Sequence, residues 1–232
     1  MVWNLRRKKI ELFMSVLIIL MAILFSSVGV RVVDGRKVQK KKQTIVIDSG
    51  HGGIDSGKVS VLGDYEKDIN LSIAKRLEKI LKKAGYNVVM TRKSDEGLYS
   101  ESSTGKKSED MRKRCAIIDS SDAVAAISIH QNSYHEENVK GAQVFFYKNS
   151  EDGKQLAECL QESLINGLDK TNTRQAKSND SYYILRKTQT PTVIVECAFL
   201  SNYEEAALII EEDYQNKVAK AILSGLKNYL EQ

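Results

Sequence analysis

The fold that we expect for this chain is inferred first from one segment, Thr44-Ile45-Val46-Ile47-Asp48-Ser49-Gly50-His51-Gly52-Gly53. It begins with a run of β-branched apolar residues and ends in glycines, and such a run predicts a short, fully buried strand. His51 stands just beyond the end of that strand and has a glycine on each side. Its imidazole is therefore predicted to project from the carboxyl end of a strand.

Strand and helix patterns alternate from this point onward. Further strands are predicted at residues 87–91, 124–130, 143–147, 182–185 and 192–195, and helices at residues 66–84, 111–119, 155–168 and 213–230. This alternation predicts an α/β fold with a mainly parallel sheet and helices on both of its faces. Sheets of this kind bind ligands beyond the carboxyl ends of their strands. The residues at those ends are therefore the candidates for a functional site.

Three further side chains are expected at the same edge of the sheet as His51. Glu66 begins the first long helix, His130 ends the third strand, and Glu196 follows the last strand. Two histidines and one glutamate make the ligand set of a catalytic zinc ion whose fourth position is left for water. A carboxylate beside such a metal can take a proton from water and pass it to a leaving amine. The constellation predicts hydrolysis of an amide or an ester.

Each of these residues also has a purely structural interpretation. His51 is then an incidental residue in a capped turn, and Glu196 is an ordinary salt-bridged carboxylate at a strand end. The wide spacing of the predicted ligands lacks the compact H-E-x-x-H signature, so the spacing does not separate the two interpretations. A phosphate-binding loop is excluded, because the turn has neither G-x-G-x-x-G nor a closing G-K-[ST].

Three other residues have weaker claims on a functional role. Arg186 follows the strand predicted at residues 182–185 and is a candidate contact for a peptide carboxylate, which arginine binds bidentately; the alternative is a surface cation. His135 lies in a polar loop and is predicted to be a surface histidine. Arg92, after the second strand, is interpreted as a structural ion-pair partner. The three cysteines lie far apart without a C-x-x-C pair, which argues against a cysteine-based zinc site and a disulfide framework.

The first 42 residues carry the positive charge of the chain. Ten of the 35 Lys and Arg residues and two of the 30 acidic residues fall there, so residues 1–42 carry +8 and residues 43–232 carry −3. Basic residues at positions 6–9 precede an apolar run at residues 12–30, which is typical of an export signal or an N-terminal membrane anchor. Small residues at positions 27–29 offer a cleavage site, and residues 36–42 are interpreted as a basic linker. The acidic remainder argues against a nucleic-acid-binding domain.

Several sequence blocks in one order carry a family resemblance. They are Ile45-Val46-Ile47-Asp48-Ser49-Gly50-His51-Gly52-Gly53-Ile54-Asp55-Ser56-Gly57, then Glu66, Met90-Thr91-Arg92, Ser128-Ile129-His130-Gln131-Asn132-Ser133 and Val195-Glu196-Cys197-Ala198-Phe199-Leu200-Ser201-Asn202. In these blocks the chain resembles the zinc-dependent N-acetylmuramoyl-L-alanine amidases of the Amidase_3 type. The resemblance covers essentially all of residues 43–232. It implies a three-layer α/β sandwich with a sheet of about six strands, residues 43–232 being the catalytic domain.

The resemblance also implies a site and a reaction. His51, Glu66 and His130 are expected to bind one zinc ion, and Glu196 is expected to be the catalytic acid/base. The departures from the family pattern remove none of these residues; they are Ser49 and Ser56, where the family usually has proline, and Ala198, where it often has glycine. The implied reaction is cleavage of the amide between N-acetylmuramic acid and L-alanine in peptidoglycan.

The layout of one leader and one catalytic domain, without wall-binding repeats, resembles the spore-cortex amidases of this family. Those enzymes strip peptides from the glycan so that muramic-δ-lactam can form. Without a wall-targeting module, the domain is expected to need an exported protein partner, and to act outside the cytoplasm. Two alternatives remain open at this stage. One is a non-catalytic wall- or partner-binding module on the same fold, suggested by the polar loop at residues 97–108; the other is a zinc peptidase that acts on another amide.

Overall fold

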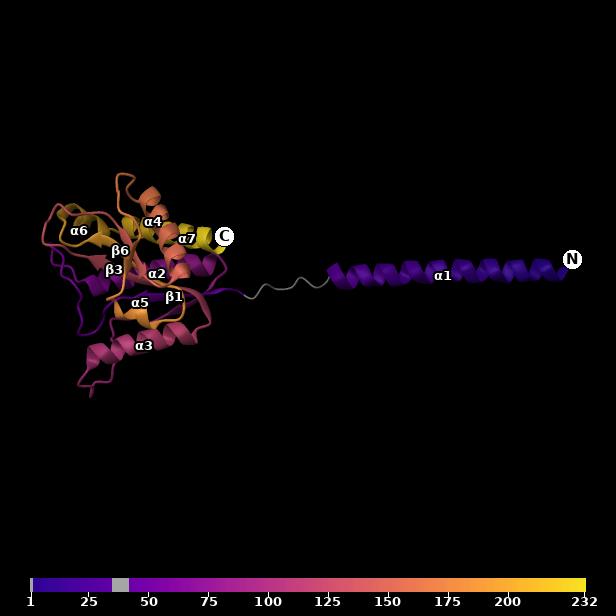
Figure 1. The fold of residues 1–232 in the computed structure, drawn as a ribbon, viewed down its shortest axis with the longest axis horizontal. Coiled ribbons are helices and arrows are strands. Elements are labelled where there is room, and N and C mark those ends of the chain that lie inside the picture. The colour runs from indigo at the N-terminus through magenta and orange to yellow at the C-terminus, as the bar shows by residue number, and fades with distance from the viewer. Residues whose placement is uncertain (1, 35–41) are drawn as a thin grey trace. The chain divides into compact units, whose positions relative to one another are not determined.

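The computed structural model describes residues 2–34 and 42–232, and within the first range it describes the side chains of residues 7–24. The chain divides into two units, Met1–Lys41 and Lys42–Gln232. The first contains helix α1 (Val2–Asp34; Figure 1). None of the helices in the described part of the chain combines the length and the apolar character that a membrane crossing requires. The predicted linker at residues 36–42 lies, except for Lys42, outside the described residues, as do the side chains of the predicted cleavage site.

The second unit is built on a six-stranded sheet with the strand order β2-β1-β3-β6-β4-β5. Its strands are β1 (Thr44–Ser49), β2 (Asn87–Met90), β3 (Ala123–Asn132), β4 (Gln143–Tyr147), β5 (Lys177–Asn179) and β6 (Thr192–Phe199). Every pair of neighbours is parallel except β4 and β6, which run antiparallel. The predicted α/β fold with a mainly parallel sheet is therefore confirmed.

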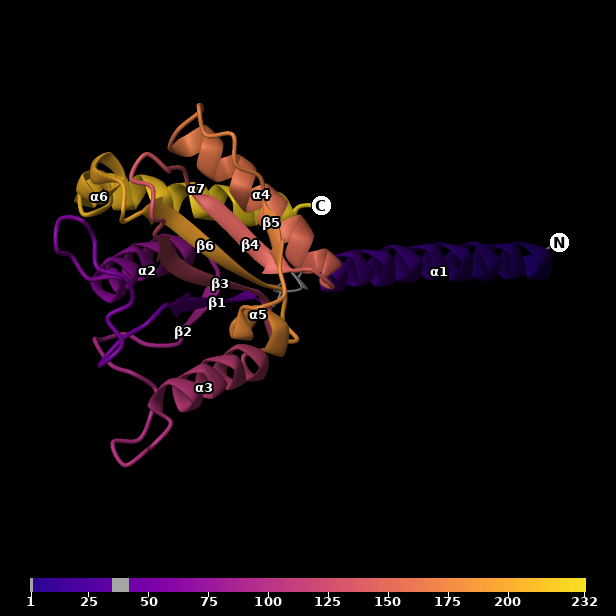
Figure 2. The ribbon, with the colours of Figure 1, turned by 60° about the vertical axis from the view of Figure 1, so that its left-hand side comes forward.

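Helices cover both faces of this sheet and make the three predicted layers (Figures 1 and 2). They are α2 (Glu66–Lys83), α3 (Lys106–Ser120), α4 (Glu151–Gly167), α5 (Tyr183–Lys187), α6 (Tyr203–Ile209) and α7 (Glu212–Leu230). Helices α2, α4 and α7 share one hydrophobic cluster with the sheet, whereas α3 and α5 pack on the opposite face. Acidic residues in the first turn of α2 and lysines in its last turn complement the helix dipole.

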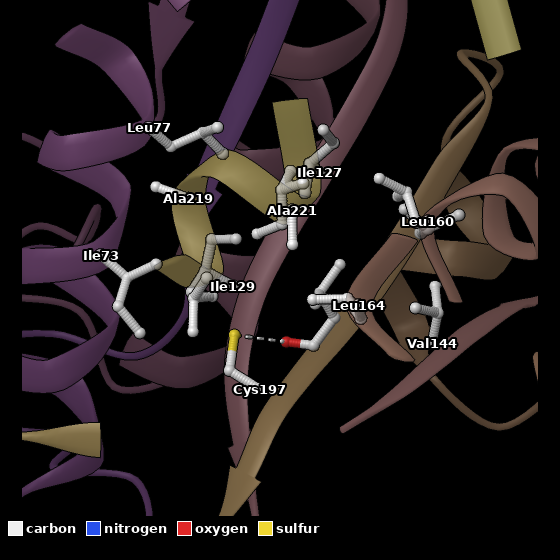
Figure 3. Packing of buried hydrophobic residues seen from close by; sticks show 14 of the residues in the cluster. Ile73, Leu77, Ile127, Ile129, Val144, Leu160, Leu164, Cys197, Ala219 and Ala221 are labelled. Carbon is white, nitrogen blue, oxygen red and sulfur yellow. Dashed lines mark hydrogen bonds between the residues drawn. The ribbon is translucent and has the colours of Figure 1, made fainter. Parts of the chain in front are cut away.

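Alternate residues of the strands supply the two hydrophobic clusters, because successive side chains of a strand point to opposite faces. In β1, Ile45 and Ile47 belong to the larger cluster and Val46 to the smaller one. Figure 3 shows the larger cluster, with Ile73 and Leu77 of α2, Leu160 and Leu164 of α4, and Ala219 and Ala221 of α7 around Ile127 and Ile129 of β3. Burying each such Leu or Ile side chain stabilises the fold by about 1.5–3 kcal/mol.

The three cysteines are free thiols, as the sequence predicts. Cys115 and Cys197 are buried and Cys159 is partly exposed. In Figure 3 the Sγ of Cys197 points into the larger cluster and donates to the Val195 carbonyl at 3.6 Å.

The strand predicted at residues 182–185 is wrong. These residues lead into helix α5, in which Arg186 N donates to Tyr182 O and Thr188 N donates to Ile184 O. The sixth strand is instead β5, a short strand paired with β4. A four-residue apolar run does not distinguish a strand from a buried helical turn by its periodicity. Here Ile184 and Leu185 are buried in the smaller cluster, so the tertiary packing selects the helix.

Candidate metal centre and active site

The four residues predicted to carry the chemistry line one cleft. His51 follows β1, Glu66 begins α2, and His130 and Glu196 lie near the ends of β3 and β6. Because β1, β3 and β6 are parallel neighbours, their carboxyl ends share one edge of the sheet. The register of β3 and β6 places His130 beside Glu196. The cleft has a volume of about 780 Å³, and all four residues line it.

The Glu66 carboxylate lies between the two imidazoles. Its Oε2 is 3.2 Å from Nε2 of His51, and its Oε1 is 2.9 Å from Nδ1 of His130. One candidate ligand atom from each residue lies within 4.8 Å of the others. The two rings meet edge to face, with centroids 4.9 Å apart. The structure thus brings together all three predicted metal ligands.

Hydrogen bonds hold the Glu66 carboxylate in its charged form. Oε2 accepts from the Lys58 N–H at 2.8 Å, and Oε1 accepts from the Gln131 N–H at 3.1 Å. Burial raises the pKa of Glu66, but the hydrogen bonds and charges of His130 and His51 together leave this pKa well below its ordinary value. Burial lowers the pKa of His130, but the hydrogen bond and charge of Glu66, with the charges of Glu196 and Asp48, leave it above its ordinary value. Glu66 is therefore an anionic candidate ligand at a buried helix start.

Two glycines keep open the space around the three ligands. A Cβ on Gly50 would lie 2.3 Å from Cε1 and Nε2 of His130. Gly57 has φ +67°, and a Cβ there would lie 2.5 Å from the Glu66 Oε2 and 2.7 Å from the His51 Cδ2. The candidate metal site therefore combines two imidazole nitrogens and one carboxylate, and the two glycines place no side chain beside them. This donor set fits a zinc ion with an open coordination position.

Replacing Gly50 with alanine is expected to weaken zinc binding by at least about tenfold, the effect seen when groups that orient metal ligands are lost. The added methyl displaces the His130 ring, since the clash is with the ring itself. Competition with a chromophoric chelator measures the affinity. Gly105→Ala is the matched control, because nothing lies within 4 Å of its Cβ position. Equal zinc affinities for the two variants would contradict the steric argument.

Glu196 is a buried carboxylate near the candidate metal ligands. It is 7% exposed, and its Oε2 has no hydrogen-bond partner. Burial raises the pKa of Glu196 to about 7, against the opposing charges of His130 and His51. The described residues include no salt bridge to Glu196, so the interpretation as a salt-bridged strand-end carboxylate is wrong. A buried carboxyl group that titrates near neutrality in a cleft is a candidate for proton transfer.

Two buried arginines hold the turn that carries His51. Arg114 donates to the carbonyl oxygens of Ser49 and His51, each at 2.6 Å, and pairs with Asp48 at 2.7 Å. Arg92 donates to the carbonyls of Ser49 and Gly50, each at 3.0 Å. His51 itself has φ 61°, a left-handed conformation that costs a non-glycine residue about 1–2 kcal/mol. The arginines thus stabilise a strained backbone at a predicted metal ligand.

Sequence reasoning missed Arg114 and misread Arg92, which bonds to backbone carbonyls rather than forming an ion pair. A signal for Arg114 was present. It lies three residues after Met111 and four before Ile118, on the helix face predicted to be buried. A charged residue on such a face predicts a buried partner, and the partner here is Asp48.

The other predicted residues lie away from the ligands. Arg186 is exposed on α5 and is not among the residues that line the cleft, although Tyr182, Tyr183 and Ile184 just before it are. His135 is an exposed residue beside Glu136. The last three residues of the predicted polar loop are helical, since α3 begins at Lys106.

Comparisons with known proteins identify the family of this chain. Residues 45–228 match the Amidase_3 family, described as N-acetylmuramoyl-L-alanine amidase. The chain is 38% identical over 189 residues to the germination-specific N-acetylmuramoyl-L-alanine amidase of Bacillus subtilis (strain 168), covering 80% of this chain and 78% of the relative.

This chain is also similar in sequence and fold to solved structures of amidases. The CwlD amidase from Clostridioides difficile, in complex with the GerS lipoprotein, is 40% identical with a TM-score of 0.80, covering 82% of this chain and 99% of that one. An N-acetylmuramoyl-L-alanine amidase from Clostridium difficile 630 is 31% identical with a TM-score of 0.73, covering 82% and 98%. The chain described here belongs to the Amidase_3 family of N-acetylmuramoyl-L-alanine amidases.

Proposed function

We propose that this protein is a zinc hydrolase that cleaves the amide bond between N-acetylmuramic acid and L-alanine in peptidoglycan. One observation carries the proposal. In a chain of this family, the cluster of His51, Glu66 and His130 shares a cleft with the buried, unpaired carboxyl group of Glu196. A cleft of about 780 Å³ also has room for a peptide stem beside the sugar that carries it.

Each residue has a defined task in this proposal. His51, Glu66 and His130 hold one zinc ion, which supplies a Lewis acid for the substrate carbonyl and a lowered pKa for water. Glu196 accepts a proton from the attacking water and delivers it to the amine of L-alanine as that amine leaves. A pKa of about 7 lets the same carboxyl group act as base and then as acid at neutral pH. Arg186 stays a candidate contact for a peptide carboxylate.

We also propose a role in spore-cortex maturation, in which peptide removal precedes muramic-δ-lactam formation. Similarity to a germination-specific amidase and to CwlD, over about four fifths of this chain, supports that role. The substrate places the activity outside the cytoplasm. The basic and apolar leader at residues 1–42 is consistent with an export signal or with a membrane anchor if it is not cleaved.

A protein partner is part of the proposal. The similar CwlD structure was solved with the GerS lipoprotein. By analogy we expect an exported partner to assist this chain, whose catalytic unit carries no wall-targeting module among the described residues. A cleavage rate of the isolated chain that no exported protein raises would refute this expectation.

Metal content and reaction products together test the main proposal. Purified wild-type protein is expected to carry one zinc ion per chain by elemental mass spectrometry, and His51→Ala to lose most of it. On purified muropeptides, mass spectrometry is expected to find free peptides that begin with L-alanine. Products cut at another amide would indicate a zinc peptidase instead. Tight muropeptide binding without hydrolysis, at confirmed zinc loading, would favour a non-catalytic binding module.

A further inference from the structure

Both ring nitrogens of His51 face a carboxylate. Nε2 points to Glu66 at 3.2 Å, and Nδ1 lies 3.0 Å from Oδ2 of Asp55. A neutral imidazole carries one proton, and the hydrogen bond at one nitrogen decides which nitrogen keeps its lone pair. Only the nitrogen with a free lone pair can bind a metal ion. The contact with Asp55 therefore bears directly on the ability of His51 to act as a ligand.

Asp55 is held in place by the turn in which it lies. The backbone of Asp55 exchanges two hydrogen bonds with Gly52, at 2.9 and 3.2 Å. The Gly57 N–H donates to Oδ1 of Asp55 at 3.2 Å, which leaves Oδ2 for His51. The backbone of Asp55 is thus held by Gly52 and its carboxylate by the Gly57 N–H, four residues after the histidine that it contacts.

Asp55 has two charged or polar side chains beside its carboxylate: His51, whose Nδ1 lies 3.0 Å from Oδ2, and Lys107. Lys107 at the start of α3 approaches Oδ2 at 3.7 Å. Its side chain is 80% exposed, so this ion pair adds little. The acceptor for the Nδ1 proton of His51 is accordingly a carboxylate held by the turn itself.

The other histidine of the cluster is positioned differently. His130 uses Nδ1 towards Glu66, and its Nε2 packs against the backbone of Gly50, where a Cβ would lie at 2.3 Å. Among the described residues, no carboxylate lies within ion-pair distance of that Nε2. Packing orients His130, whereas a hydrogen bond orients His51. Asp55 therefore contacts one of the two histidines, His51, and not the other.

We propose that Asp55 is a positioning residue that keeps the proton of His51 on Nδ1 and so leaves Nε2 free to bind the metal ion. The inference rests on the proposed zinc site and adds to it a residue outside the ligand set. A merely structural alternative exists, since Asp55 also caps the Gly57 N–H. The test must therefore report on the histidine itself.

Nitrogen NMR of the zinc-free, full-length protein reads the tautomer of His51 directly. Wild type is expected to show a protonated Nδ1, the nitrogen that faces Asp55. Asp55→Ala is expected to lose this preference. Asp55→Asn keeps a carbonyl oxygen that accepts the Nδ1 proton, and it is expected to retain the wild-type tautomer. A wild-type tautomer in Asp55→Ala would overturn the proposal.

Zinc affinity, measured by chelator competition, provides the second readout. Asp55→Ala is expected to bind zinc about 10–100-fold more weakly, and Asp55→Asn to recover most of that loss. Asp95→Ala is the matched control, because Asp95 accepts from the Gly53 N–H at 2.9 Å in the same turn and contacts no histidine. Equal losses in Asp55→Ala and Asp95→Ala would assign Asp55 a structural role and overturn the proposal.

Zinc affinity separates a failure of the proposed zinc site from a failure of the role of Asp55. Wild-type protein without measurable zinc affinity would refute the proposed function. Wild-type protein that binds zinc, with Asp55→Ala equal to it in affinity, would refute the positioning role alone.

Discussion

Glu196→Gln is expected to lower the rate of amide hydrolysis by about 10²–10⁴-fold, the contribution typical of a positioned acid/base. Glutamine keeps the shape of the side chain but cannot exchange a proton with water or with the leaving amine. The rate is measured as release of peptides from purified muropeptides. Zinc content is measured in the same samples, because equal zinc loading separates loss of proton transfer from loss of metal. Unchanged peptide release at equal loading would refute the role of Glu196.

The same substitution is expected to stabilise the zinc-free protein above neutral pH. Burial raises the pKa of Glu196 from 4.5 to about 7, so the fold favours the uncharged acid. The stability that Glu196 contributes is present in full below its unfolded pKa and is lost as the pH rises through the folded one. From pH 5 to 8, wild type is therefore expected to lose on the order of 3 kcal/mol relative to Glu196→Gln, at 1.36 kcal/mol per pKa unit.

Urea unfolding in the presence of a chelator tests this pH dependence. Glu158→Gln is the matched control, because Glu158 is an exposed residue of α4. Its stability curve is expected to run parallel to that of wild type, while the curve of Glu196→Gln diverges upward with pH. Three parallel curves would mean that the folded protein accommodates a charged Glu196 without cost.

Arg114→Met is expected to destabilise the protein by about 3–5 kcal/mol, the cost of leaving one partner of a buried ion pair uncompensated. Arg114 and Asp48 are each 2% exposed in their side chains and pair at 2.7 Å. Although burial opposes the charge of Asp48, Arg114 and its neighbours hold the pKa of this carboxyl at about 2. Methionine fills much of the volume of the arginine but leaves that charge buried. Chemical denaturation measures the loss.

Two further variants keep this prediction testable if Arg114→Met does not fold. Arg112→Met replaces an exposed arginine of the same helix, and it is expected to change stability by less than about 0.5 kcal/mol. Combining Asp48→Asn with Arg114→Met removes the uncompensated charge and is expected to recover part of the stability. Equal midpoints for Arg112→Met and Arg114→Met would refute the importance of the buried pair.

The class of fold and the candidate ligands could be predicted from the amino-acid sequence. The β-branched run of β1 and the helical spacing of apolar residues in α2 are local patterns, and local patterns predict local structure. Parallel strands place their carboxyl ends at one edge, so His51, His130 and Glu196 share that edge once the strands are identified. The family blocks assign the same residues.

The tertiary structure was needed to show which of these side chains are in contact and how burial shifts their pKa values. Residues 183–185 are helical because packing against α3 and the sheet overrides a short apolar run. The pKa of Glu196 depends on its burial after folding, and the role of Arg114 depends on Asp48, sixty-six positions earlier in the chain. Such properties belong to pairs of distant residues and to the space between them. A linear pattern carries the identity of each residue, whereas charge, strain and proton position are determined by what surrounds it after folding.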